Sequence, residues 1–197
     1  MGFLITAWIS LVMILPDRVE NWKKGYEGER KTARALASLA GPDCAILHDL
    51  PDHRRPGHDD KGNMDHVVVS PAGVFLLDSK WLGGAVSIED GQVHVTMLDD
   101  EFASVDGWLA EKTRRCAKRL YYDVIKQQVP IGFVRAVIVF WNDFEQGVVD
   151  GHERRKITFL HGEQVAEWLR EETKGGTKSS EWVAEVTSCI KETRPLS

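Results

Sequence analysis

Residues 64–80 place the tightest constraint on what this chain can fold into. They form two apolar runs of strand composition, separated by residues 70–73, whose Ser-Pro-Ala-Gly sequence is typical of a tight turn. We therefore predict two antiparallel strands joined as a hairpin. Because alternate side chains of a strand share a face, Asp78 and Lys80 are expected to point the same way, and Asp65 can meet them at the open end of the hairpin.

Two convergent carboxylates and a lysine are the side chains of a minimal magnesium site for phosphodiester hydrolysis. Mg²⁺ held by Asp65 and Asp78 would activate a water and neutralise phosphate oxygens, and the backbone carbonyl of Ser79 could be a further ligand. Lys80 could orient the water, act as its base if its pKa is lowered, or neutralise developing charge. The alternative is that Asp78 and Lys80 only form an ion pair at the edge of the sheet.

The rest of the sequence predicts an α/β protein with a mixed sheet between helices. Residues 133–141 are apolar almost throughout, as in a strand that is buried on both faces. The other expected strands cover residues 44–50, 85–88, 92–97 and 157–160, and the expected helices cover residues 25–40, 104–127, 162–172 and 181–191.

The chain begins with an apolar segment, residues 3–15, which ends at Pro16 and is followed by several basic residues. As a helix this segment would span only about 20 Å, less than the roughly 30 Å of a bilayer core. One interpretation is a short membrane anchor with the domain on the cytoplasmic side, and the other is a helix packed on the domain or on a partner. The predicted division is an N-terminal segment (residues 1–18), a main domain (residues 19–173), and a linker with a C-terminal helix (residues 174–197).

The net charge limits how the chain could bind nucleic acid. A charge of −5 argues against binding by bulk attraction, so contact would need a local basic patch. Arg115, Lys118 and Arg119 share one face of an expected helix and could supply this patch, although an ordinary solvated surface is the alternative. The three cysteines are far apart without metal-binding spacing, so they predict buried or free thiols in a reducing compartment.

The first expected helix opens with Gly25, Gly28 and Glu29. Glycine in a helix costs roughly 1 kcal/mol relative to alanine, which makes sense if another backbone or a ligand approaches closely. Glu29 could then reach a metal or its water shell. The alternative is that Glu29 only complements the helix dipole.

Three separated pieces of sequence carry a family resemblance. They are Gly25-x-x-Gly28-Glu29, residues 62–69 (GNMDHVVV) and residues 73–80 (GVFLLDSK). In this order they resemble the nuclease-related domain (NERD) family, which is similar to the PD-(D/E)xK restriction-endonuclease-like nucleases. The resemblance implies a restriction-endonuclease-like α/β fold with an αβββαβ core. It also implies that Asp65 and Asp78 are metal ligands, that Lys80 is the catalytic lysine, and that Glu29 is the acidic residue of the first helix.

Two departures from the superfamily pattern are visible. Asp78 stands where glutamate is frequent, and its side chain is shorter by one methylene. Trp81 follows Lys80 where many relatives carry a small or polar residue. Trp81 could stack on a base or sugar, or simply pack against the domain.

The function predicted from the sequence is a nuclease that uses Mg²⁺, or Mn²⁺ in its place, to hydrolyse phosphodiester bonds of DNA. One alternative is a nuclease-like domain that binds nucleic acid without cutting it. Another is an interaction domain tethered to a membrane through residues 3–15. The expected location is the cytoplasm, with or without a tether to the inner face of the membrane. DNA versus RNA, endonuclease versus exonuclease, and oligomeric state stay open at this point.

Overall fold

The computed structural model describes residues 22–52, 62–82, 84–89, 92–96, 102–104, 106–144, 149–150 and 157–195. The apolar segment of residues 3–15 lies outside these ranges. Among the helices within them, none has the length and hydrophobicity needed to cross a bilayer.

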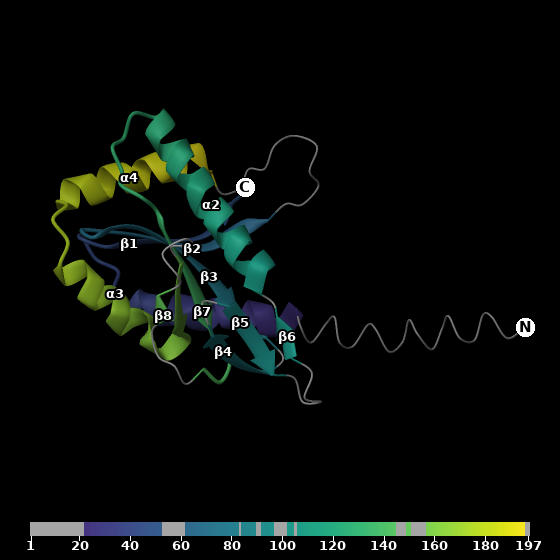
Figure 1. Cartoon of the computed structure of the whole chain (residues 1–197). Coiled ribbons are helices and arrows are strands. Elements are labelled where there is room, and N and C mark those ends of the chain that lie inside the picture. Colours follow the sequence, from purple (N-terminus) through teal and green to yellow (C-terminus); the bar gives the residue numbers. More distant parts are fainter. Residues whose placement is uncertain are drawn as a thin grey trace, which may run out of the picture.

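A mixed sheet forms the centre of the fold (Figure 1). Its strands, in spatial order, are β1 (Ala45–Pro51), β2 (Asn63–Ser70), β3 (Gly73–Lys80), β7 (Arg135–Phe140), β9 (Ile157–His161) and the short edge strand β8 (Val149–Asp150). The pairings from β1 to β3 are antiparallel, whereas β3 pairs with β7 and β7 with β9 in parallel. Strands β2, β3 and β7 are almost entirely buried, as expected of strands covered on both faces.

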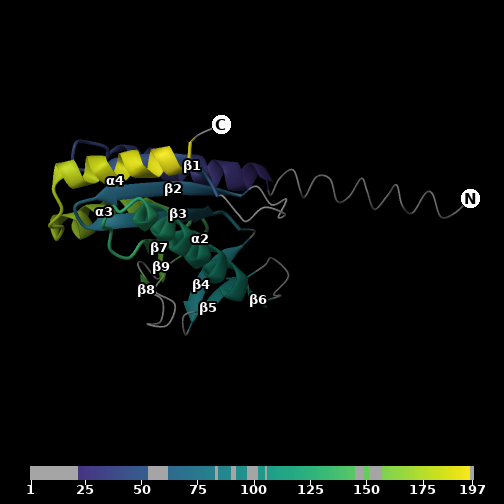
Figure 2. The ribbon, with the colours of Figure 1, turned by 90° about the horizontal axis from the view of Figure 1, so that it is seen from above.

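Helices cover the two faces of this sheet (Figures 1 and 2). They are a helix over residues 22–37, α2 (Asp106–Lys126), the 3-10 turn η1 (Gly162–Gln164), α3 (Val165–Lys174) and α4 (Ser180–Thr193). Strand alternation divides the core between them: Leu76 packs in the cluster formed with α2 and α4, and its neighbour Leu77 in the cluster formed with the first helix and α3. Both sets of helices therefore pack on the same central strands, from opposite faces of the sheet.

The order of elements confirms the expected fold class. The helix over residues 22–37 is followed by β1 to β3, then by α2 and the parallel strand β7, which is the αβββαβ core of a restriction-endonuclease-like fold. The β2–β3 hairpin has the predicted turn, in which Gly73 has φ 123°. The cysteines Cys44, Cys116 and Cys189 are free and buried, as predicted.

A second, three-stranded antiparallel sheet is inserted between β3 and α2. It consists of β4 (Ala85–Glu89), β5 (Gln92–Thr96) and β6 (Phe102–Ser104). The sequence predicted the two strands of the β4–β5 hairpin but assigned Ser104 to the following helix, which begins only at Asp106. Three residues are too few to show the alternation that identifies a strand, so β6 exists only through its pairing with β5.

Asn142 holds this second sheet close to the end of β3. Its side-chain oxygen accepts a hydrogen bond from Leu82 N at 2.8 Å, and its amide nitrogen donates to the carbonyls of Leu82 and Gly84. A Cβ atom at Gly84 would lie 2.1 Å from the carbonyl oxygen of Thr96 and collide with it, so only glycine fits at this position. These contacts fix the path of the chain directly after Lys80.

Candidate active site

The β2–β3 hairpin brings two acidic residues to the same end of the sheet. The strands are in register with His66 opposite Leu77, and one step further along this register puts Asp65 opposite Asp78. The backbone N–H of Ser79 donates a hydrogen bond to Asp65 Oδ2 at 2.8 Å. The convergence of carboxylates expected from the sequence is therefore present.

Lys80 completes this group from the end of β3. Its Nζ lies 2.7 Å from Asp78 Oδ2 and 3.1 Å from the backbone carbonyl oxygen of Ser79. The side chains of Lys80 and Asp78 are only 19% and 15% exposed, so solvent screens their charges weakly. The two oxygens that hold this ammonium group are among those that the sequence suggested as metal ligands.

The charges of the site shift its pKa values. Burial, followed by the charges of Asp78 and Glu29, raises the pKa of Asp65 to about 7. Burial acts to lower the pKa of Lys80, but the charges of Asp78 and Asp65 outweigh it, and the pKa is raised. Lys80 therefore keeps its proton at neutral pH. A lowered pKa, the condition under which it could act as a general base, is not met in this structure.

Glu29 reaches the same end of the sheet from the helix over residues 22–37. Burial and then the charge of Asp49 raise the pKa of Glu29, and Asp78 adds to this effect. Lys80 acts in the opposite sense. Because the charges of both Asp78 and Lys80 act on the pKa of Glu29, Glu29 lies near these two residues. A role at the metal or its water shell requires this position.

A buried threonine fixes this helix against the strands of the site. Thr32 is completely buried, and its hydroxyl oxygen accepts hydrogen bonds from Ser79 Oγ and Trp141 Nε1, both at 2.8 Å. The same hydroxyl donates to the carbonyl of Gly28 at 3.1 Å. All the hydrogen-bonding capacity of the group is thus used. Since Glu29 lies less than one turn from Thr32, these contacts set the position of Glu29 relative to β3.

Among the described residues, Gly28 of this helix lies near another backbone and Gly25 does not. A methyl group at Gly25 would meet no atom of the described chain within 4 Å. At Gly28 its nearest neighbours would be the side chains of Trp81 at 3.5 Å and Trp141 at 3.6 Å and the backbone nitrogen of Trp81 at 3.8 Å, which are ordinary contacts. The approach of a backbone expected from the sequence is therefore present at Gly28, but it is not so close that only glycine fits there. The ring of Trp81 is covered by Lys31, whose Nζ lies 3.9 Å from the ring centroid.

The nuclease-related domain (NERD) family model matches residues 24–141, more than half of the chain. The chain belongs to this family. The NERD family is part of the PD-(D/E)xK-like superfamily, and the matched region contains Glu29, Asp65, Asp78 and Lys80.

A curated relative of the NERD domain protein described here is an uncharacterized protein of Bacillus anthracis. The two are 30% identical over 86 residues, which make up 42% of this chain and 39% of the relative. The match thus spans less than half of the relative's length. No solved structure gives a significant match.

Helix α2 supplies a contact in the NERD domain that the sequence did not reveal. The hydroxyl of Thr113 lies 3.3 Å from Asp78 Oδ2 and 3.1 Å from the carbonyl of Leu109, and its proton is shared between them. Thr113 and Lys80 thus both contact the same oxygen of Asp78. A threonine in the middle of a basic helix carries no recognisable signal in the sequence.

Asp49 is a second residue that sequence reasoning missed. The pairing on either side of it places Asp49 opposite Asp65, and its φ of 53° lies in the left-handed region, which few residues other than glycine adopt. Asn63 Nδ2 donates a hydrogen bond to Asp49 Oδ1 at 3.0 Å. The polar pair His48-Asp49 inside an apolar strand was the available signal.

His66 lies next to Asp65 in sequence, and because successive side chains of a strand alternate between its faces, His66 points to the opposite face of the sheet. Its Nδ1 is 2.8 Å from Nδ1 of His48, so one ring donates and the other accepts. Burial and the charge of His48 lower the pKa of His66 to about 4. His66 is thus a buried, neutral ring paired with His48, and its role is to pack the sheet.

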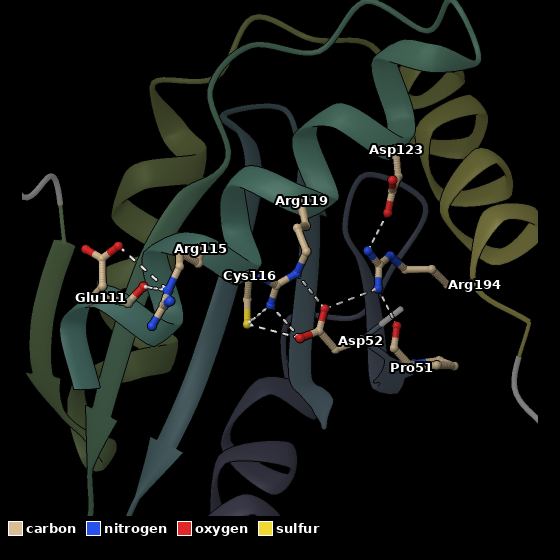
Figure 3. Close-up of polar contacts among 8 residues, drawn as sticks. All are labelled: Pro51, Asp52, Glu111, Arg115, Cys116, Arg119, Asp123 and Arg194. Carbon is tan, nitrogen blue, oxygen red and sulfur yellow. Dashed lines mark hydrogen bonds and ion pairs between the residues drawn. The ribbon is translucent and has the colours of Figure 1, made fainter. Parts of the chain in front are cut away.

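The three residues of the expected basic patch on α2, which are Arg115, Lys118 and Arg119, differ in their contacts (Figure 3). Arg119 donates from Nε and Nη2 to the two carboxylate oxygens of Asp52, at 2.9 and 2.5 Å, and the Asp52 side chain is 1% exposed. Arg115 is exposed, with Nε 3.7 Å from Glu111, and Lys118 is exposed as well. A phosphate would compete with the buried carboxylate of Asp52 for Arg119. Arg115 and Lys118 are therefore the residues of the patch that are best placed to bind a phosphate.

The partner of Arg119 belongs to a larger buried network (Figure 3). Asp52 Oδ1 also lies 4.0 Å from Nη1 of Arg194, a completely buried side chain that donates to Asp123 and to the carbonyl of Pro51. These contacts join the end of β1, the middle of α2 and the residue that follows α4. Their role is to hold these elements together.

Proposed function

We propose that this NERD domain is a nuclease that uses Mg²⁺, or Mn²⁺ in its place, to hydrolyse phosphodiester bonds of DNA. The observation that carries the proposal is the contact of Lys80 Nζ with both the Asp78 carboxylate and the Ser79 carbonyl, beside the carboxylate of Asp65. Two acids and a charged lysine at the end of a buried strand suit phosphodiester hydrolysis. Membership of a nuclease-related family supports this interpretation.

The chemistry of the donor groups fits a hard divalent cation. In the part of the chain that the structure describes, no three His, Cys, Asp or Glu side chains form a metal-binding cluster. Mg²⁺, however, is usually held by one or two carboxylates together with waters and substrate phosphates. Asp65, Asp78 and the carbonyl of Ser79 would hold it. Burial and then the negative charges of Asp78 and Glu29 raise the pKa of Asp65, and a bound cation would balance this charge. When bound, the metal would neutralise phosphate oxygens and lower the pKa of a water ligand.

The side chains of the site would divide the remaining tasks. Lys80, which keeps its proton, would donate to a phosphate oxygen and stabilise the charge that develops there. Glu29 has a pKa above its ordinary value, which brings it closer to the range useful for accepting a proton from the attacking water. Ser79 N–H and Thr113 would hold the carboxylates of Asp65 and Asp78 in place.

Arg115 and Lys118 are the proposed contacts to the phosphate backbone. Both are exposed on α2, the helix that also contributes Thr113 to the site. Each cation that neutralises a DNA phosphate adds about −0.9 to the slope of log affinity against log salt. Replacing both residues by methionine is therefore expected to reduce this slope by roughly two.

The direct test is cleavage of plasmid and linear DNA by the full chain with Mg²⁺, Mn²⁺ or EDTA. Asp78→Asn and Lys80→Met are each expected to slow the metal-dependent cleavage at least about 100-fold. Lys126→Met is the matched control, because it removes an exposed lysine from the last turn of α2, and it should cut like the wild type.

Cleavage that survives both site substitutions, or that is absent with both metals, would refute the proposal. DNA binding without cleavage would then favour the non-cutting alternative. Membrane attachment through residues 3–15 is a separate proposal that rests on the sequence alone. Flotation of the full chain with lipid vesicles, compared with a chain lacking these residues, tests it.

A further inference from the structure

Trp22 and Tyr26 form an exposed aromatic stack on the helix over residues 22–37. Their side chains are 74% and 58% exposed, and their rings lie nearly parallel, with an interplanar angle of 15° and centroids 6.4 Å apart. Neither residue belongs to the apolar clusters that form the core. Adjacent large aromatic side chains that are exposed together, unlike single exposed ones, are a feature of binding sites.

The stack lies on the same flank of the helix as Glu29. Tyr26 precedes Glu29 by three residues and Trp22 precedes it by seven, spacings that place all three side chains in one row. At 1.5 Å per residue, the two aromatic residues lie about 5 and 10 Å from Glu29 along the helix axis. With a rise of about 3.4 Å per nucleotide, bases within about three nucleotides of a phosphate at Glu29 would reach them.

The charge of this helix is opposite to that of the whole protein. Residues 22–37 carry five basic and two acidic side chains, a net charge of +3, whereas the chain has a net charge of −5. The basic residues are Lys23, Lys24, Arg30, Lys31 and Arg34. Exposed aromatic rings beside basic side chains are the combination with which proteins bind single-stranded nucleic acid.

We propose that Trp22 and Tyr26 stack on unpaired bases of a nucleic-acid strand whose backbone passes the site at Glu29. This assignment rests on the proposed nuclease function and narrows its substrate to single-stranded or frayed nucleic acid. The π-faces of the bases match the rings, and the phosphates match the basic helix. Stacking of this kind contributes about 1–3 kcal/mol per base and tolerates any base sequence.

Binding of a fluorescent single-stranded oligonucleotide of mixed sequence to the full chain in EDTA tests the stack without requiring cleavage. Replacing Trp22 and Tyr26 together by alanine is expected to raise Kd at least about 10-fold. Replacing both by phenylalanine, which keeps the rings, should leave Kd within about threefold of the wild type. Phe133→Ala is the matched control, because Phe133 is 54% exposed but precedes β7 at the end of the sheet opposite the site.

Leucine at both positions keeps apolar surface but removes the rings, and it should weaken binding as much as alanine. A blunt duplex of the same sequence, whose bases are paired, should show no dependence on the rings. The proposal is overturned if the wild type does not bind the oligonucleotide, or if the leucine variant binds as well as the wild type. It is also overturned if the substitutions weaken duplex binding equally, or if they impair vesicle flotation while oligonucleotide affinity is unchanged.

These results separate the two proposals. Ring-dependent binding together with absent cleavage would leave the stack standing and refute the nuclease. Cleavage that depends on Asp78 and Lys80, together with binding that does not depend on the rings of Trp22 and Tyr26, would support the nuclease and refute the stack.

Discussion

Replacing Asp65 by asparagine is expected to stabilise the protein when no divalent metal is present, although the proposed chemistry needs this carboxylate. Asp65 is 7% exposed, and its pKa rises from 3.8 to about 7 on folding. Between these pH values the folded state binds the proton more tightly than the unfolded state. The free energy of unfolding therefore falls as the pH rises through this window, and the full cost of the charge is present above about pH 7.

The magnitude follows from the size of the shift. At about 1.4 kcal/mol per pKa unit, the rise from 3.8 to about 7 corresponds to an upper limit of about 4 kcal/mol. The amide oxygen of the variant can still accept from Ser79 N–H, but its NH₂ group must find an acceptor, for which we allow about 2 kcal/mol. The expected net gain is about 2 kcal/mol at about pH 8. It is close to zero at about pH 5, where much of the charge cost is absent.

Urea unfolding in EDTA, followed by tryptophan fluorescence, measures this gain. For a chain of this length, 2 kcal/mol corresponds to a rise in Tm of about 4–8 °C. Asp143→Asn is the matched control, because it neutralises an exposed carboxylate and should change stability little. A variant no more stable than the wild type at about pH 8, or equally stabilised at about pH 5, would refute the electrostatic argument. Added Mg²⁺ should stabilise the wild type more than the variant.

Two further substitutions test contacts that hold the site in place. Asp52→Asn leaves the half-buried Arg119 without its carboxylate and removes one of the two carboxylates beside the buried Arg194 (Figure 3), and urea unfolding should show a loss of about 3–5 kcal/mol. A loss below about 1 kcal/mol would show that this network is no stronger than a surface ion pair. Thr32→Val keeps the shape but removes the acceptor for Ser79 and Trp141, so it should cost about 2 kcal/mol and slow any cleavage, whereas Thr32→Ser should keep both properties. A Thr32→Val variant as stable and as active as the wild type would contradict the role given to the hydroxyl group.

The sequence by itself determined the hairpin and the relative directions of its side chains. In a strand the backbone geometry alone sends Asp78 and Lys80 to one face and Ser79 to the other, so no knowledge of distant contacts was needed. The apolar run that became β7 likewise showed a strand covered on both faces. The element order and the three family pieces were enough to identify the fold class.

The tertiary structure alone decided which side chains from other elements meet this hairpin and with what charge. Thr113 and Asp49 reach the site because α2 packs on β3 and β1 pairs with β2, contacts that no local pattern encodes. Arg119 looked like part of a basic surface, yet packing placed the buried carboxylate of Asp52, far away in sequence, against it. The sequence left the protonation state of Lys80 undecided for the same reason. A pKa depends on burial and on the sum of neighbouring charges, and both exist only once the chain is folded.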